Sequence, residues 1–175
     1  MKLNLGCGFV FREGYVNFDY VPHKDWAKPD VVGKIEDLPE PFQEAQFSEI
    51  IMVHVFEHFY YSPCIKILKD CLFLLKKGGK LVIEGPCIVG VVEAYWVKNK
   101  DLKSLIEQLY AREDLRLEYG NEYMHKWGWT GELVGEEMAK VGFSEVNVTK
   151  CGACGGEGGK LHHNPFRDFR VEGTK

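Results

Sequence analysis

The chain has 175 residues, of which 45% are hydrophobic and 27% are charged, and its formal charge is −4. This size and balance are typical of one globular domain, so we expect residues 1–175 to form a single domain. The negative charge argues against nucleic acid as a partner, because surfaces that bind phosphate backbones are usually basic. No run approaches the roughly 18–20 apolar residues that cross a bilayer, and no leader precedes the first predicted strand, so we expect a cytoplasmic protein without a membrane partner.

The first two predicted strands end in residues that suit a nucleoside ligand. The apolar strand around Leu3 and Leu5 runs into Gly6-Cys7-Gly8, and the strand of residues 15–19 ends at Asp19. Glycine lets the backbone turn tightly and approach a ligand closely. A carboxylate at the tip of the neighbouring strand can accept hydrogen bonds from both hydroxyls of a ribose. Together they predict a nucleoside site at the carboxyl edge of a parallel sheet.

The spacing of the glycines excludes the two common phosphate-binding loops. In a dinucleotide fold the third glycine of Gly-x-Gly-x-x-Gly allows close helix packing, but Phe11 stands at that position here. The Gly-Lys-Ser/Thr ending of a Walker loop is absent from the sequence. The ligand is therefore expected to carry a ribose without a phosphate at this turn.

The rest of the chain alternates strand and helix signals, which predicts a mostly parallel sheet with helices on both faces. Further strands are predicted at residues 30–33, 47–54, 80–84, 144–148 and 166–172. One helix is predicted to start at Ser62-Pro63 and to end at Gly78-Gly79, since Ser caps helices and Pro favours their first position. A second is predicted around residues 102–109. A third is predicted to be capped by Thr130 and to stop at Gly142.

Residues 87–129 interrupt this rhythm, and we expect them to form a substrate-side insertion. The segment is rich in aromatic side chains: Tyr95, Trp96, Tyr119, Tyr123, Trp127 and Trp129. Such residues most often belong to the core. If they line a pocket, their ring faces suit a sugar or a flat heterocycle. Both interpretations stay open at this point.

Taken in order, these motifs resemble those of the class I S-adenosylmethionine-dependent methyltransferases. The resemblance rests on residues 3–8, residues 15–19, Asp37-Leu38-Pro39, residues 54–59 and the glycine turn before the fifth strand. It implies a Rossmann-like seven-stranded sheet, mostly parallel with an antiparallel last strand, and S-adenosyl-L-methionine as cofactor. It is closest to short predicted methyltransferases often linked to saccharide pathways. The expected function is therefore methyl transfer to a small-molecule or saccharide acceptor, at a hydroxyl.

The resemblance also implies roles for individual residues. Gly6 and Gly8 would face the methionine portion of the cofactor, Asp19 the ribose, and Asp37 and Leu38 the adenine. His54, at the end of the fourth strand, would stand near the sulfonium. The predicted cofactor-binding residues are Leu5, Gly6, Cys7, Gly8, Asp19, Asp37, Leu38 and His54.

Histidines supply the candidate acid–base groups, because an imidazole titrates near neutrality. His54, Glu57 and His58 form one cluster in the sequence, and His125 lies in the aromatic segment. We predict His54 and His125 as catalytic residues, although His54 fits a core histidine equally well. For Glu57 we favour a simple role at the start of a helix, where an acid stabilises the positive end of the dipole.

The six cysteines are expected to be thiols, as in a reducing compartment, with Cys64, Cys71 and Cys87 in the core. Cys151 and Cys154, followed by His162 and His163, have ligand types found at zinc sites. Adjacent histidines cannot easily both reach one tetrahedral ion, so we expect no metal and keep a zinc-organised interaction domain as an alternative.

Two further expectations follow from the shortness of the fold. Only about a dozen residues separate Gly6 from Asp19, so the helix between them must be nearly absent. This compression favours, as the alternative function, a degenerate methyltransferase fold that binds cofactor or a partner without catalysis. Apolar surface left uncovered near the carboxyl edge of the sheet could be buried in a homodimer.

Overall fold

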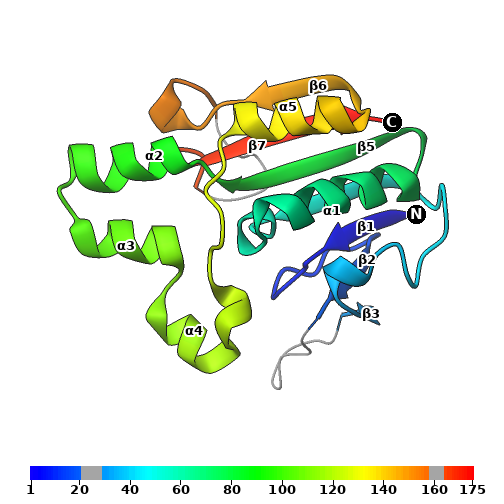
Figure 1. Cartoon of the computed structure of the whole chain (residues 1–175), viewed down its shortest axis with the longest axis horizontal. Helices are drawn as coiled ribbons and strands as arrows, with labels where there is room; N and C mark the ends of the chain where they lie inside the picture. The colour runs from blue at the N-terminus through cyan, green and yellow to red at the C-terminus, as the bar shows by residue number, and fades with distance from the viewer. Residues whose placement is uncertain (21–28, 158–163) are drawn as a thin grey trace.

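The computed structural model describes residues 1–20, 29–157 and 164–175, and is built on one seven-stranded sheet. The strand order is β3-β2-β1-β4-β5-β7-β6 (Figure 1). The strands from β3 to β5 are parallel, whereas β7 runs antiparallel to both β5 and β6. The predicted Rossmann-like sheet with an antiparallel last strand is confirmed.

The strands are β1 Lys2–Leu5, β2 Val16–Asp19, β3 Val31–Val32, β4 Phe47–Val53, β5 Leu75–Pro86, β6 Ser144–Thr149 and β7 Asp168–Thr174. The α-helices are α1 Tyr61–Leu74, α2 Ile88–Val92, α3 Leu102–Tyr110, α4 Glu113–Tyr119 and α5 Gly131–Val141. Short 3-10 turns span Ile35–Asp37, Phe56–His58, Asn121–Tyr123 and Gly152–Cys154, and a π-helical turn spans Glu93–Lys98.

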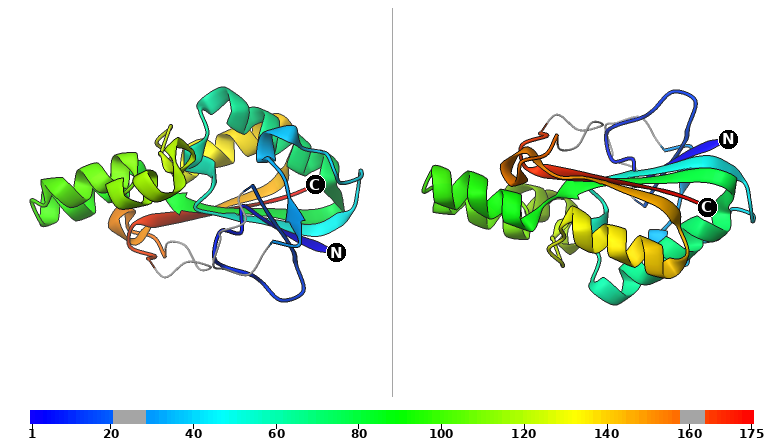
Figure 2. Two further views of the ribbon diagram at one scale, coloured as in Figure 1. Left: turned by 90° about the horizontal axis from the view of Figure 1, so that it is seen from below. Right: turned by 90° about the horizontal axis from the view of Figure 1, so that it is seen from above.

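Helices α1 and α5 pack side by side on one face of the sheet (Figure 2). On the other face, the described chain carries the loop between β1 and β2 instead of a helix, so the prediction of helices on both faces is wrong for the described residues. The reason is the compression expected between Gly6 and Asp19, which leaves too few residues for a helix. The core lies between the sheet and the two helices, where Phe18, Ile50 and Ile83 are fully buried.

Helix α1 differs at both ends from its prediction. It begins at Tyr61, so Ser62 lies inside the helix, and the N-cap residue Tyr60 makes no side-chain capping bond. It ends at Leu74, because the fully buried Leu75 pairs with Phe47 of β4. Strand pairing therefore overrides the local helix signal. Gly78 and Gly79 form an irregular turn within β5, where Gly78 has a φ of +76°.

Helix α5 begins and ends as predicted. The Thr130 hydroxyl accepts a hydrogen bond from the backbone N–H of Leu133 at 3.2 Å, which satisfies one of the free donors of the first turn. Gly142 closes the helix in the left-handed region, with a φ of +119°. The cap fixes where the chain turns from residues 121–129 back onto the sheet.

The segment from α2 to α4 forms an arm beyond the carboxyl ends of the parallel strands (Figures 1 and 2). The predicted helix around residues 102–109 is α3, whose N-cap Asp101 accepts a hydrogen bond from the Ser104 N–H at 3.0 Å. Helices α2 and α4 were not predicted. Within the described ranges, no helix combines the length and the apolar character that crossing a membrane requires.

The aromatic residues of this region divide between core, surface and pocket. Trp129 is 1% exposed and packs against Phe56 with ring centroids 4.9 Å apart. Trp96 and Trp127 are exposed, whereas Tyr123 lines the pocket described below. The core interpretation is therefore right for Trp129, and the pocket interpretation is right for Tyr123.

Candidate functional site

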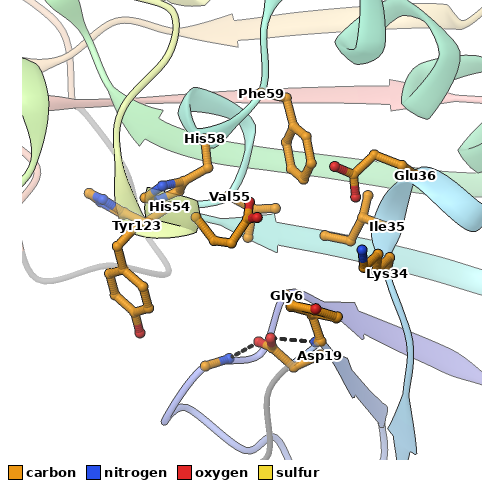
Figure 3. Close-up of a pocket in the computed structure, with 13 residues that line it drawn as sticks. Gly6, Asp19, Lys34, Ile35, Glu36, His54, Val55, His58, Phe59 and Tyr123 are labelled. Carbon is orange, nitrogen blue, oxygen red and sulfur yellow. Dashed lines mark hydrogen bonds between the residues drawn. The ribbon is translucent and has the colours of Figure 1, made fainter. Parts of the chain in front are cut away.

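A pocket opens at the carboxyl ends of β1, β2 and β4 (Figure 3). It is lined by Gly6, Gly8, Asp19, Tyr20, Lys34, Ile35, Glu36, His54, Val55, His58, Phe59, Glu122 and Tyr123. In this view Gly6 and Asp19 lie at its base, Lys34 to Glu36 on one side, and His58 with Tyr123 on the other. The structure thus brings together four residues predicted from the sequence: Gly6, Gly8, Asp19 and His54.

The glycine turn after β1 has a steric requirement at Gly6. This residue has a φ of +71°, and a Cβ built on it would lie 2.4 Å from Cγ2 of Val55. Gly8 also has a positive φ, of +50°, but a Cβ there would meet nothing within 4 Å. Gly6 is therefore required by the protein's own packing, whereas the space beside Gly8 is open to a ligand.

Asp19 is held at the base of the pocket by two backbone amides. The N–H of Gly8 donates to Oδ2 at 2.6 Å, and the N–H of Tyr20 donates to Oδ1 at 2.6 Å. Each carboxylate oxygen accepts more than one hydrogen bond, so both keep capacity for a ligand hydroxyl. This arrangement fits a ribose, whose two neighbouring hydroxyls can each reach one oxygen of the carboxylate.

The other four predicted cofactor residues do not line the pocket. Leu5 is fully buried in the core, and Leu38 is 2% exposed. Cys7 is also buried, which together with the charge of Asp19 raises the pKa of its thiol to about 12. Asp37 is exposed, one residue beyond the stretch from Lys34 to Glu36 that faces the pocket.

His54, directly after β4, lies between two buried carboxylates. Its Nε2 is 2.9 Å from Oδ2 of Asp168, and its Nδ1 is 3.3 Å from Oε1 of Glu57. Asp168 begins β7 and is fully buried, and its Oδ1 accepts a hydrogen bond from Nε of Arg167 at 2.9 Å. When His54 is protonated, the carboxylates of Asp168 and Glu57 are therefore balanced by the two cations His54 and Arg167.

The carboxylates determine the charge of His54. Burial disfavours the imidazolium, but the hydrogen bonds to Asp168 and Glu57 outweigh burial and raise the pKa of His54 to about 9. Burial likewise opposes ionisation of Glu57, but the His54 hydrogen bond and charge prevail and lower its pKa to about 2. His54 is thus a cation at neutral pH and has no lone pair with which to accept a proton.

The structure gives Glu57 a further role and adds Asp168. Glu57 lies in the first turn of the 3-10 helix Phe56–His58, ahead of helix α1, and it is also 2% exposed and paired with His54. Asp168 was missed because 114 residues separate it from His54. The sequence did carry one signal, because an acid stands in the first half of the last predicted strand. Nothing in the neighbouring sequence, however, indicates which residue this acid would pair with.

His125 lies apart from the pocket, behind His58. The two ring centroids are 5.0 Å apart, and Nδ1 of His125 lies 2.8 Å from the carbonyl oxygen of Gln108, to which it donates. Burial lowers the pKa of His125, so this imidazole is neutral where His54 is charged. Ligand atoms of Glu57, His58 and His125 lie within 4.8 Å of one another. Glu57 therefore links the two predicted catalytic histidines.

All six cysteines are free thiols, and Cys64, Cys71 and Cys87 are buried as predicted. The structure brings Cys87 to Cys151 and Cys154, with the three sulfur atoms within 4.8 Å of one another. His162 and His163, the other residues of the suspected zinc site, lie outside the described residues.

Residues 16–83 match the family model described as a methyltransferase domain. A search of curated proteins finds no significant match. The sequence match therefore runs from β2 into β5. The matched residues include Asp19, His54 and Glu57.

Solved structures extend the likeness to the whole fold. A SAM-dependent methyltransferase from Archaeoglobus fulgidus superposes with a TM-score of 0.64 at 13% identity, over 99% of this chain and 85% of that one. One from Methanosarcina mazei gives 0.61 at 14% identity, over 99% and 91%. A possible histamine N-methyltransferase from Thermotoga maritima gives 0.56 at 18% identity, over 99% and 81%. At these identities the likeness concerns the fold.

Proposed function

We propose that this chain is a class I S-adenosylmethionine-dependent methyltransferase that methylates a hydroxyl of a saccharide or another small molecule, since its fold and the sequence of residues 16–83 both match methyltransferases. The observation that carries the proposal is Asp19, fixed by the amides of Gly8 and Tyr20 at the base of an open pocket. The cofactor supplies an electrophilic methyl group on a sulfonium.

The cofactor side of the pocket runs from Gly8 past Asp19 to Lys34–Glu36. The open space beside Gly8 suits the methionine portion, and the carboxylate of Asp19 suits the ribose. The buried Ile35 offers an apolar surface for the adenine, next to the carboxylate of Glu36. We therefore propose an adenine contact slightly before Asp37 and Leu38, the residues that the family resemblance implied.

The acceptor side is formed by His54, His58, Glu122 and Tyr123. Methyl transfer needs the nucleophile aligned with the methyl group at about 3–3.5 Å, and a base helps when the nucleophile is a hydroxyl. We assign proton acceptance to His58, which lines the pocket on the side opposite Lys34 to Glu36. His54, already protonated, acts instead as a fixed hydrogen-bond donor that orients its surroundings.

A saccharide fits the mixed character of this side. The rings of Phe59 and Tyr123 present flat apolar faces, while Glu122 and His58 can hydrogen-bond hydroxyl groups. The alternative of a degenerate, non-catalytic module has less support, because the ribose acid and an ionisable acceptor side are both present.

Calorimetric titration with S-adenosylhomocysteine tests the cofactor assignment. We expect the wild-type protein to bind and Asp19→Ala to bind about 10- to 1,000-fold more weakly, since hydrogen bonds to a charged group contribute about 1.5–3 kcal/mol each. Asp19→Asn keeps one acceptor oxygen and should lie between the two. Asp114→Ala, at an exposed acid on α4, is the matched control and should bind normally.

A panel of hydroxyl and amine acceptors, with S-adenosylhomocysteine release as readout, then tests the reaction. Turnover with saccharide hydroxyls that is lost in His58→Ala, while cofactor binding persists, supports the acceptor and the base together. Cofactor binding without turnover on any acceptor would favour the degenerate module. Absence of binding to folded wild-type protein would refute the cofactor site itself.

We also propose that two copies of the chain associate through α3. Leu102, Ile106 and Tyr110 are four residues apart in turn, so they share one face of the helix, and they are 54%, 48% and 57% exposed. A second copy would cover this stripe. Light scattering should give a dimer at micromolar concentration and a monomer for Ile106→Glu, whereas a wild-type monomer would refute the association.

A further inference from the structure

Three cysteine sulfurs converge at the end of β5, outside the cofactor pocket. Cys87 directly follows β5, while Cys151 and Cys154 flank the short turn after β6. The sulfurs of Cys87 and Cys154 are 4.0 Å apart, and all three lie within 4.8 Å of one another. Segments more than 60 residues apart therefore place three soft ligand atoms around one point.

We propose that Cys87, Cys151 and Cys154 form a structural site for one thiophilic divalent cation, Zn²⁺. Zinc binds thiolates at about 2.3 Å in a tetrahedron, which puts two bound sulfurs about 3.8 Å apart. The distance between the sulfurs of Cys87 and Cys154 is already close to this value. Three thiolates leave one position of the tetrahedron for a further ligand, as in the known class of zinc sites with three cysteines.

The backbone around these sulfurs is arranged as a metal-binding turn. The 3-10 turn of Gly152–Cys154 is closed by the N–H of Cys154, which donates to the Cys151 carbonyl at 2.9 Å, and Gly155 follows with a φ of +80°. These backbone hydrogen bonds hold Cys151 and Cys154 on one short turn.

The surroundings favour a single enclosed ion. Cys151 is fully buried and Cys87 is 3% exposed, while Cys154 is half-buried. A Cβ on Gly90 would lie 2.6 Å from the Cys151 sulfur, so only glycine lets α2 pack this closely. An iron–sulfur cluster spreads its thiolates over several iron atoms and would hold them farther apart than these three lie.

The ion would stabilise the segment that supplies Asp168. The N–H groups of Gly152 and Ala153 donate to the carbonyls of Pro165 and Phe166, each at 2.8 Å, and that of Cys87 donates to Arg167 at 3.1 Å. Zinc would therefore fix the approach to β7, and with it the carboxylate that pairs with His54. The site is structural, since its three ligands lie outside the residues that line the cofactor pocket.

Elemental analysis of protein purified without metal-affinity resin tests the proposal. We expect about one zinc per wild-type chain and a loss of most of it in Cys87→Ser and Cys151→Ser. Cys71→Ser, at a buried thiol on α1, is the matched control and should keep its zinc. Wild-type levels of zinc in both site variants would overturn the assignment of the ligands.

A second measurement uses only the wild-type protein, and so remains valid if the variants fail to fold. Cobalt is titrated into wild-type protein that has been reduced and depleted of metal. Thiolate-to-cobalt charge-transfer absorption that saturates at one equivalent, and is abolished by zinc, would support the site. Depletion should also lower the melting temperature, because an ion that binds only the folded state stabilises it. Absence of both zinc and cobalt uptake, or a disulfide between any two of these cysteines in the native protein, would refute it.

Discussion

His54 owes its charge to two carboxylates, one of which is 114 residues away in the sequence. Its ring nitrogens face Asp168 and Glu57, and both carboxylates are almost completely buried. A buried carboxylate without a partner is strongly unfavourable, so the imidazolium and the two acids depend on one another. His54 is therefore a fixed positive charge. The proton acceptor of the proposed methyl transfer is accordingly assigned to a different residue.

The stability of the protein should depend on pH through this cluster. The pKa of His54 rises from 6.5 to about 9 on folding, so its contribution is complete below about pH 6.5 and is lost as the pH rises through 9. The difference in unfolding free energy between wild-type protein and His54→Gln should therefore shrink between about pH 6 and pH 10. Urea denaturation at both pH values measures it.

His125→Gln is the control for this experiment, because burial lowers the pKa of His125, so that its imidazole is neutral in both the folded and the unfolded protein at about pH 8 and above. Its difference from the wild type should be the same at about pH 8 and pH 10, whereas the difference for His54→Gln should still shrink over this interval. A difference for His54→Gln that is equally constant would mean that His54 is neutral in the folded protein.

The sequence predicted the pocket residues that depend on local backbone chemistry. Gly6, Gly8 and Asp19 lie within 14 residues, and a strand that ends in glycines beside a strand that ends in an acid is sufficient to place them. Asp168 could not be predicted, since its role exists only through the pairing of β7 with β5. Cys87 was predicted as a core residue, and its approach to Cys151 likewise follows from tertiary structure.

Among the helices, α5 shows how local signals and packing agree. Thr130 caps its first turn, Gly142 closes its last turn, and Val134 and Met138 are fully buried against the sheet. Helix α1 shows the opposite case, since Leu75 pairs with β4 although the sequence favours continuing the helix to Gly78. The ends of elements are predictable where a cap decides them and unpredictable where strand pairing does.

Removal of the Thr130 cap should weaken α5. Thr130→Ala leaves the Leu133 N–H without its acceptor, and we expect the free energy of unfolding to fall by about 1 kcal/mol. Thr130→Ser keeps the hydroxyl and should retain most of the stability in the same denaturant titration. Equal losses in both variants would show that the methyl group of Thr130, not its hydroxyl, matters.

For the whole molecule, the family resemblance predicted the sheet better than the strand and helix patterns of individual segments did. The seven strands and the antiparallel β7 follow from it, whereas α2, the π-helical turn and α4 do not. These elements form the arm at the carboxyl edge of the sheet, where irregular turns replace regular periodicity. The sequence therefore located this arm as a break in the regular pattern but did not predict the elements that form it.

The position of β7 has a consequence for how the protein is made. It is inserted between β5 and β6 although it follows both in the chain. On the ribosome, the strands that carry Gly6, Asp19 and His54 emerge first, and β5 keeps an unpaired edge until residues 168–174 follow. We expect nascent chains arrested near residue 150 to be sensitive to protease along this edge, and released full-length chains to be resistant. The residues proposed to hold the nucleoside would then be synthesised well before the carboxylate that pairs with His54.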